Sequence, residues 1–261
     1  MRSFTHPLSS KKHLMMETYN LGAYWVERPE DAEACAQRLA HMVRLLEPVD
    51  PLFARWFKNA KSLKETLKRP LDAELAGLRK YIQSKLMKDD RRQPIPELGF
   101  SFGLWNGESG GDDVWLNIAC GGYSEWVPNS CVLRLPDEGA IGERVLTTTF
   151  QAEVLRAIAT AWDPDWGVAI SIPHRDIIEK KCPHVLVGWV TYLSHRLGRV
   201  PPLPAPVRIE PVGELGTLLT LTPERFTASN PEHLALAERV RELLDRAGLL
   251  QRPQPRPHTP S

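Results

Sequence analysis

One short stretch of the chain fits a catalytic pattern: Gly99-Phe100-Ser101-Phe102-Gly103 matches the G-x-S-x-G sequence of serine hydrolases. In those enzymes the serine is exposed on a sharp turn between a strand and a helix. Here apolar Phe100 and Phe102 alternate with Ser101, and the turn-rich sequence NGESGG follows, which is typical of a half-buried strand. We therefore predict that Ser101 is an ordinary strand residue. A serine hydrolase is the alternative, because carboxylates and imidazoles follow Ser101 in the order that such enzymes use: Asp163, Asp165, His174, His184 and His195.

A second cluster contains residue types that bind metals. His174, Cys182 and His184 lie close together in IPHRDIIEKKCPH, and imidazole and thiolate are the usual ligands of zinc. The set offers three ligands and lacks the spacing of a zinc finger. The carboxylates of Asp163 and Asp165 in WDPDWG are explained by an Asp-Pro turn between a helix and a strand. The chain also lacks the glycine patterns that bind nucleotide phosphates, so we predict neither a metal nor another cofactor.

Tryptophan and acidic residues beside turns favour the binding of another protein. The chain has eight Trp, and aromatic side chains beside exposed loops are preferred anchors of protein interfaces. We predict that the loops at 105–113 and 123–129 form one contact edge. Its expected contact residues are Trp105, Asn106, Glu108, Asp112, Asp113, Trp126 and Asn129. The alternative is that Trp126 belongs to the core and that the acidic loop is only solvated.

Apolar periodicity predicts the elements that position these residues. Strands are expected at 19–26, 97–105, 113–121, 130–135, 167–172, 185–193, 206–212 and 216–222. Helices are expected at 29–46, 71–82, 146–158 and 231–247; the last has Asn230 as N-cap, Pro231 at its first position and Gly248 just past its end. A run of three strands with helices before and after it indicates an α+β fold, with a mostly antiparallel sheet packed against helices in a single domain.

Composition limits the partners and the compartment. A formal net charge of +1 gives no global attraction to nucleic acid or to an anionic membrane, and no apolar run is long enough to span a bilayer. Four cysteines without C-x-x-C spacing suit a reducing cytoplasm. We predict a flexible extension at 1–16, a folded domain at 17–250 and a disordered Pro-rich tail at 251–261. Met15 or Met16 is an alternative start to Met1.

Several segments carry a resemblance to a known family. They are LGAYWVERPEDAEACAQRLAHMVRLLEPVDPLFARWF at 21–57, ELGFSFGLWNG at 97–107, YSEWVPNSCVL at 123–133, AWDPDWGVAIS at 161–171, and the stretch from VGWVTYLSHRLGRVPP to AERVRELLDRAGLL at 187–250. In these segments the chain resembles the immunity protein 52 family of bacterial polymorphic-toxin and type VI secretion systems. Ser101 lies inside one of them, in agreement with its interpretation as a strand residue.

The resemblance implies a protein without enzymatic activity that binds and neutralises a toxin encoded beside it. The associated toxins resemble DNases with a restriction-endonuclease fold. For such a partner, Glu108, Asp112 and Asp113 are expected to face the basic cleft that a nuclease uses for phosphates. The resemblance implies no catalytic residues, no small-molecule substrate, and no binding of nucleic acid or membrane by the immunity protein itself. A general protein-interaction module without a toxin partner is a further alternative.

Overall fold

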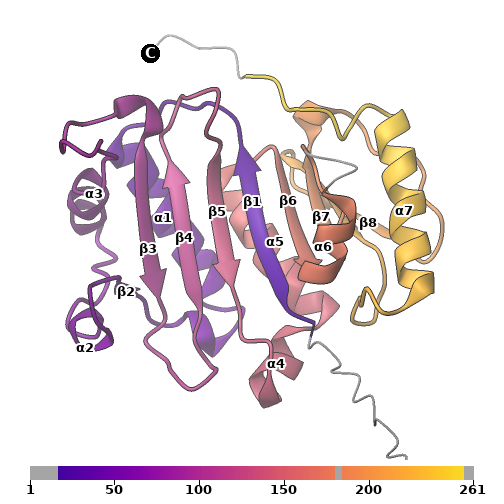
Figure 1. The fold of residues 1–261 in the computed structure, drawn as a ribbon, viewed down its shortest axis with the longest axis horizontal. Helices are drawn as coiled ribbons and strands as arrows, with labels where there is room; N and C mark the ends of the chain where they lie inside the picture. Colours follow the sequence, from indigo (N-terminus) through magenta and orange to yellow (C-terminus); the bar gives the residue numbers. More distant parts are fainter. Residues whose placement is uncertain (1–16, 180–183, 256–261) are drawn as a thin grey trace, which may run out of the picture.

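The computed structural model describes residues 17–179 and 184–255. Its centre is a nine-stranded sheet in the order β2-β3-β4-β5-β1-β6-β7-β9-β8, in which all neighbours are antiparallel (Figure 1). The strands are β1 (Tyr19–Trp25), β2 (Phe57–Lys58), β3 (Phe100–Trp105), β4 (Trp115–Cys120), β5 (Asn129–Arg134), β6 (Trp166–Ser171), β7 (Val190–Ser194), β8 (Arg208–Val212) and β9 (Gly216–Thr220). The predicted α+β fold with a mostly antiparallel sheet is confirmed.

Helices cover both faces of this sheet. They are α1 (Ala32–Leu46), α2 (Leu63–Thr66), α3 (Leu75–Gln83), α4 (Gly139–Val145), α5 (Thr148–Trp162), α6 (Ile172–Ile178) and α7 (Pro231–Arg246), with short 3-10 turns at Pro51–Phe53, Pro96–Leu98 and His195–Leu197. In Figure 1, α1 and α5 lie behind the sheet, whereas α6 and α7 lie in front of its β6–β8 half. None of the helices in the described residues combines the length and the apolar composition that a membrane span requires.

Local sequence explains where the long helices begin. The side chain of Asp31 accepts a hydrogen bond from the N–H of Ala34 and caps α1, and Asn230 caps α7 in the same way, as predicted. The helix predicted from residue 71 begins only at Leu75. The predicted 146–158 helix is preceded by the separate α4, because the backbone leaves the helical conformation at Leu146 before Thr147 caps α5. The short α6 was not predicted, although Ser171 caps it.

The main core lies between the sheet and the helices behind it. The side chains of β1 alternate between the two faces of the sheet. Trp25 points to the face covered by α1 and α5, where its ring stacks on Trp162 of α5 at 5.5 Å. Met42 of α1 joins the same layer, since its sulfur accepts the indole N–H of Trp162 at 3.1 Å. The cysteines in the described residues, Cys35, Cys120 and Cys131, are buried free thiols. Burial raises the pKa of the Cys131 thiol, which keeps it in the unreactive protonated form.

Candidate functional site

The two loops predicted to form one contact edge lie at opposite ends of strand β4. The 106–114 loop joins β3 to β4 beside the pair Trp105–Trp115, whereas the 121–128 loop joins β4 to β5 beyond the pair Phe100–Cys120. Consecutive antiparallel hairpins must reverse at opposite ends of the strand they share. The prediction of a single edge is therefore wrong, and the two loops are separate surfaces (Figure 1).

The 106–114 loop is closed by its own polar contacts. Trp105 is only 1% exposed, and its ring packs against Trp115 at 5.7 Å and Phe57 at 6.2 Å. Asn106 is also buried. Its Oδ1 accepts the N–H of Val114 at 3.0 Å, and its Nδ2 donates to the carbonyl oxygen of Asp112 at 3.1 Å. In this structure Trp105 and Asn106 hold the loop together and are not available as contact residues.

Two of the three acidic side chains of this loop, those of Glu108 and Asp113, have intramolecular partners. The Glu108 carboxylate forms an exposed ion pair with Arg55 at 3.1 Å, and Asp113 Oδ2 accepts the indole N–H of Trp115 at 2.5 Å. Asp112 is half-buried and contributes its carbonyl oxygen to Asn106. Part of the negative charge expected to face a partner is thus already engaged within the chain.

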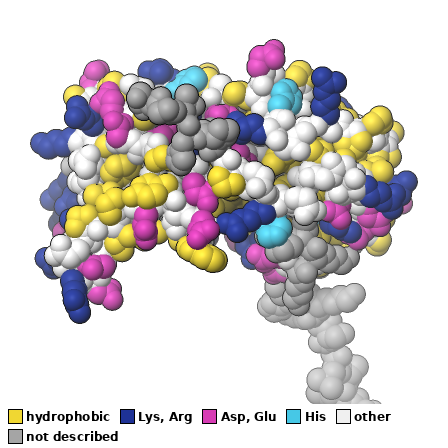
Figure 2. All heavy atoms as spheres, turned by 90° about the horizontal axis from the view of Figure 1, so that it is seen from above, with side chains coloured by type: hydrophobic (Ala, Val, Ile, Leu, Met, Phe, Trp, Pro, Cys, Tyr) yellow, Lys and Arg dark blue, Asp and Glu magenta, His cyan; other side chains and the backbone are white. Residues whose placement is uncertain are grey.

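The 121–128 loop, by contrast, presents apolar side chains to solvent. Trp126 is 80% exposed, with Tyr123 at 46% and Val127 at 48%. Asn129 is buried beneath them, where its Oδ1 accepts the N–H of Gly122 at 2.9 Å and its Nδ2 donates to the carbonyl oxygens of Gly122 and Val26. Asn129 therefore fixes the loop, and Trp126 is the exposed residue. Figure 2 shows this end of the molecule, where hydrophobic side chains lie among charged ones.

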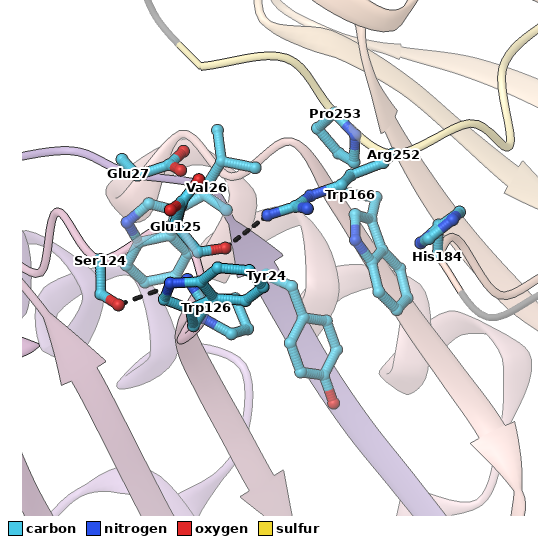
Figure 3. Close-up of a pocket in the computed structure, with 12 residues that line it drawn as sticks. Tyr24, Val26, Glu27, Ser124, Glu125, Trp126, Trp166, His184, Arg252 and Pro253 are labelled. Carbon is cyan, nitrogen blue, oxygen red and sulfur yellow. Dashed lines mark hydrogen bonds between the residues drawn. The ribbon is translucent and has the colours of Figure 1, made fainter.

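Trp126 forms the rim of a pocket of about 410 Å³. The floor comes from the neighbouring strands β1 and β6, whose paired residues Tyr24 and Trp166 stack with ring centroids 4.5 Å apart. The remaining walls come from Trp25, Val26, Glu27, Ser124, Glu125, Pro128, His184, Arg252 and Pro253 (Figure 3). Aromatic rings that line a concave site together with polar groups are the usual form of a binding pocket.

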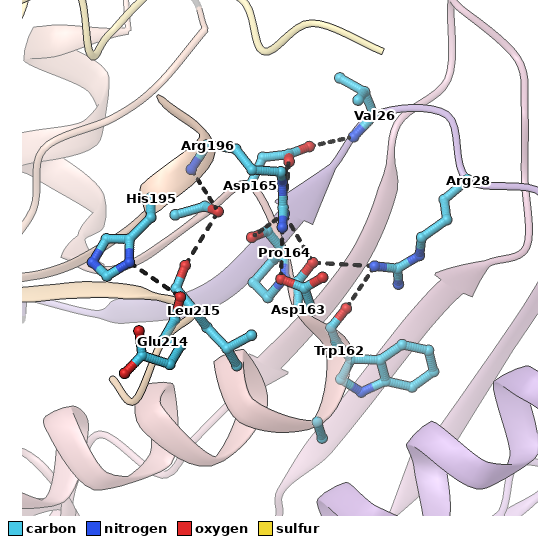
Figure 4. Close-up of polar contacts among 12 residues, drawn as sticks. Val26, Arg28, Trp162, Asp163, Pro164, Asp165, His195, Arg196, Glu214 and Leu215 are labelled. Atoms are coloured by element: carbon cyan, nitrogen blue, oxygen red, sulfur yellow. Dashed lines mark hydrogen bonds and ion pairs between the residues drawn. The ribbon is translucent and has the colours of Figure 1, made fainter. Parts of the chain in front are cut away.

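A network around Asp165 holds the two strands that form this floor. Its Oδ2 accepts the backbone N–H of Val26 at 2.9 Å, just past the end of β1, and its Oδ1 pairs with Arg196 at 3.0 Å (Figure 4). Arg196 also pairs with Asp163 at 2.8 Å. Burial alone lowers the pKa of the Arg196 guanidinium, but hydrogen bonds and charge interactions with Asp163 and Asp165 raise it overall. The network fixes the start of β6 and hence Trp166, which directly follows Asp165.

A family model for immunity protein 52 matches residues 17–253. The chain belongs to the immunity protein 52 family. No curated protein matches it. Among solved structures it is similar to the type VI secretion system protein PA0821 of Pseudomonas aeruginosa, with 15% sequence identity and a TM-score of 0.49 over 87% of this chain and 73% of that one.

Ser101 in this family member is a strand residue, as predicted. It lies within β3 and pairs with Ala119 of β4, and its backbone N–H donates to the carbonyl oxygen of Lys85 at 3.1 Å. Asp163 and Asp165 precede β6, which lies four strands away in the sheet, a separation of roughly 19 Å at the usual strand spacing. Ser101 therefore has neither the strand-to-helix turn of a hydrolase nor these carboxylates within reach.

The residue types considered for metal binding are dispersed among the described residues. His174 of α6 is buried and stacks on Phe226 at 4.8 Å, and burial lowers its pKa to about 4 although the charge of Glu238 opposes this shift. His184 lines the aromatic pocket, and Cys182 lies outside the described residues. Across 17–179 and 184–255, no three His, Cys, Asp or Glu side chains group closely enough to hold a metal ion. Asp163 and Asp165 form the predicted turn, since Asp163 ends α5 in the left-handed conformation.

Most residues of the pocket were not predicted from the sequence. Tyr24 lies near the end of β1 and Glu27 follows that strand, whereas Arg252 and Pro253 come from the segment predicted to be a disordered tail. The structure places Pro253 in a buried position, and the family match also extends to residue 253. The signal in the sequence that could have indicated this pocket was a tryptophan beside a proline turn. Trp166 follows an Asp-Pro turn, and Trp126 precedes a Val-Pro turn. Only strand pairing brings these segments together.

Proposed function

We propose that this immunity protein neutralises a cognate toxin by binding it through the surface around Trp126 and the aromatic pocket. The observation that carries the proposal is the exposure of Trp126, at 80%, on the rim of a pocket with two further stacked rings. Tryptophan is among the side chains that contribute most to protein interfaces. When a partner covers a large apolar ring that is exposed to water, the free energy falls, and this favours the complex.

The rigidity of the loop supports the same surface. Asn129 ties the loop to the carbonyl oxygens of Gly122 and Val26, so little freedom remains to be lost when Trp126 is covered. The stacked pair Tyr24–Trp166 is held by strand pairing and by the neighbouring Asp165 network. Preformed aromatic contacts of this kind favour high affinity because binding does not have to order them.

We propose that the partner is a DNase effector of a type VI secretion system and that the immunity protein binds it in the cytoplasm. The family resemblance supports this class of toxin. The net charge of +1 argues against imitation of DNA by the whole surface, which needs a strong acidic excess. The proposed mechanism is therefore coverage of one toxin surface, which obstructs access of DNA and requires no catalysis by the immunity protein.

The test is co-expression with the toxin encoded in the neighbouring gene. Wild-type protein is expected to restore growth and to form a complex that survives size-exclusion chromatography. Trp126→Ala should lose both at an unchanged melting temperature, whereas Ile209→Ala, which removes another exposed apolar side chain on the distant edge strand β8, should retain both. Equal protection by the two variants would refute the proposed surface.

The absence of catalysis has a separate test. Ser101→Ala is expected to protect as well as the wild type, because Ser101 is a strand residue far from the carboxylates of Asp163 and Asp165. A loss of protection at unchanged stability, or ester hydrolysis that depends on Ser101, would favour the hydrolase instead.

A further inference from the structure

The aromatic pocket contains a carboxylate, that of Glu27, for which the described part of the chain supplies no hydrogen-bond partner. Glu27 follows β1, is half-buried and lines the pocket. Its Oε2 is buried, and among the described residues it has no hydrogen-bond partner. A buried carboxylate oxygen without a hydrogen bond is unfavourable, so a ligand that supplies a positive charge and N–H donors would be stabilised here.

The chain itself places one cation at the mouth of this pocket. Arg252, from the segment after α7, donates a hydrogen bond from Nη2 to the carbonyl oxygen of Glu125. In Figure 3 its guanidinium extends over the pocket, between Glu125 and Trp166. Arg252 is exposed and forms no ion pair within the described residues, so this single contact is readily exchanged.

We infer that the pocket is a guanidinium site, which Arg252 partly covers in the free protein and which an arginine side chain of the toxin occupies in the complex. This inference rests on the proposed function. The planar guanidinium stacks on aromatic faces such as those of Tyr24, Trp126 and Trp166, and its fork of N–H groups suits the Glu27 carboxylate and the Glu125 carbonyl oxygen. A nuclease that binds DNA has arginine side chains on its surface.

The site can be probed without the toxin, by titration with N-acetyl-L-argininamide. The indole N–H signals in 15N-labelled protein report binding, and Trp126→Phe identifies the signal of Trp126. Arg252→Ala should bind the probe about threefold more tightly than the wild type, because the covering side chain is removed. Arg246→Ala, which removes an exposed arginine of α7, is the matched control and should bind like the wild type.

The charge of the site has its own comparison. In the Arg252→Ala background, Glu27→Gln should weaken probe binding at least about threefold, whereas Glu47→Gln at the exposed end of α1 should leave it unchanged. The citrulline analogue, a neutral probe of the same shape, should give no saturable shift, and the lysine analogue should bind more weakly than the arginine probe. Equal binding of either analogue, or no effect of Glu27→Gln, overturns the guanidinium site. Equal affinity of Arg252→Ala and wild type overturns the covering role of Arg252.

Failure of this inference can be told apart from failure of the proposed function. If the arginine probe binds as described but the wild type captures no toxin, the guanidinium site is supported and the proposed toxin binding is refuted. If the toxin binds wild type and Glu27→Gln equally well and the probe does not bind at all, the proposed toxin binding is supported and the guanidinium site is refuted.

Discussion

The loops at the two ends of β4 share one sequence signal, a tryptophan near turn residues, but differ in structure. Each has a tryptophan beside turn residues, yet Trp105 is 1% exposed and Trp126 is 80% exposed. Trp105 is the last residue of β3, where Phe57 and Trp115 pack against it. Trp126 lies in the middle of its loop, outside the β4–β5 pairing that would place a neighbour beside it. A tryptophan at the last position of a strand is thus buried, whereas one that lies three residues before the next strand is exposed.

Unlike the two tryptophans, the asparagines of the two loops have the same environment and the same role. Asn106 and Asn129 are both buried, and each ties its loop together through backbone N–H and carbonyl groups. Amides beside turns thus stabilise both loops, whereas exposure of the aromatic ring to a partner depends on where the ring lies relative to the strands.

The largest expected effect is on toxin binding by Trp126→Ala. Removal of an exposed indole at the centre of an interface should weaken the complex about 100-fold, or about 3 kcal/mol, measured by isothermal titration calorimetry. The loop keeps its hydrogen bonds through Asn129, so the free energy of unfolding should change little. An affinity within threefold of the wild type would mean that the exposed loop is not the interface.

The two asparagines should affect stability equally but binding differently. Asn106→Ala and Asn129→Ala each leave buried backbone groups without a partner, and each should lower the free energy of unfolding by about 2 kcal/mol in urea titrations. Only Asn129→Ala should also weaken toxin binding, because it releases the loop that carries Trp126. Weaker binding by Asn106→Ala at a temperature where it is fully folded would contradict the division between the loops.

Acid should destabilise the domain through His174, which belongs to neither loop. Burial lowers the pKa of His174 from its ordinary value of 6.5 to about 4, so between these values the unfolded chain binds a proton that the folded protein does not. This contribution to stability is full above pH 6.5 and falls as the pH drops toward 4, by about 2 kcal/mol at pH 5. His174→Leu should flatten the pH dependence in urea titrations, and His195→Leu, at an exposed site, should not. A slope retained in His174→Leu would exclude His174 as its source.

The smallest effect is expected from Asp112→Lys combined with Asp113→Lys. These side chains are half-buried in a loop that Asn106 holds closed, and Asp113 already accepts the indole N–H of Trp115. We expect toxin affinity within about twofold of the wild type and a stability loss of about 0.5 kcal/mol. A large loss of affinity that is greater at low salt than at high salt would restore the acidic loop as a contact surface.

The sequence predicted the fold well because periodicity and capping are local signals. The cap residues Asp31 and Asn230 and the alternation around Ser101 each depend on a few neighbouring residues. The pocket was not predictable in the same way. Tyr24 and Trp166 meet only because β1 pairs with β6, and Arg252 reaches them only once α7 has packed. Trp126, singled out from its turn, is exposed, whereas Trp105, with the same signal, is buried.

The central position of β1 has a consequence for the synthesis of this protein. The strand is translated before the rest of the sheet, yet its hydrogen-bonding partners are β5 and β6, which follow more than a hundred residues later. At ordinary translation rates this interval is on the order of ten seconds, during which the apolar edge of Tyr19–Trp25 has no native partner strand. The aromatic pocket, which needs β1, β6 and the residues after α7, is assembled only once the chain has been translated as far as Pro253. Under the proposed function, a nascent chain therefore has no complete toxin-binding surface until Pro253 has been translated.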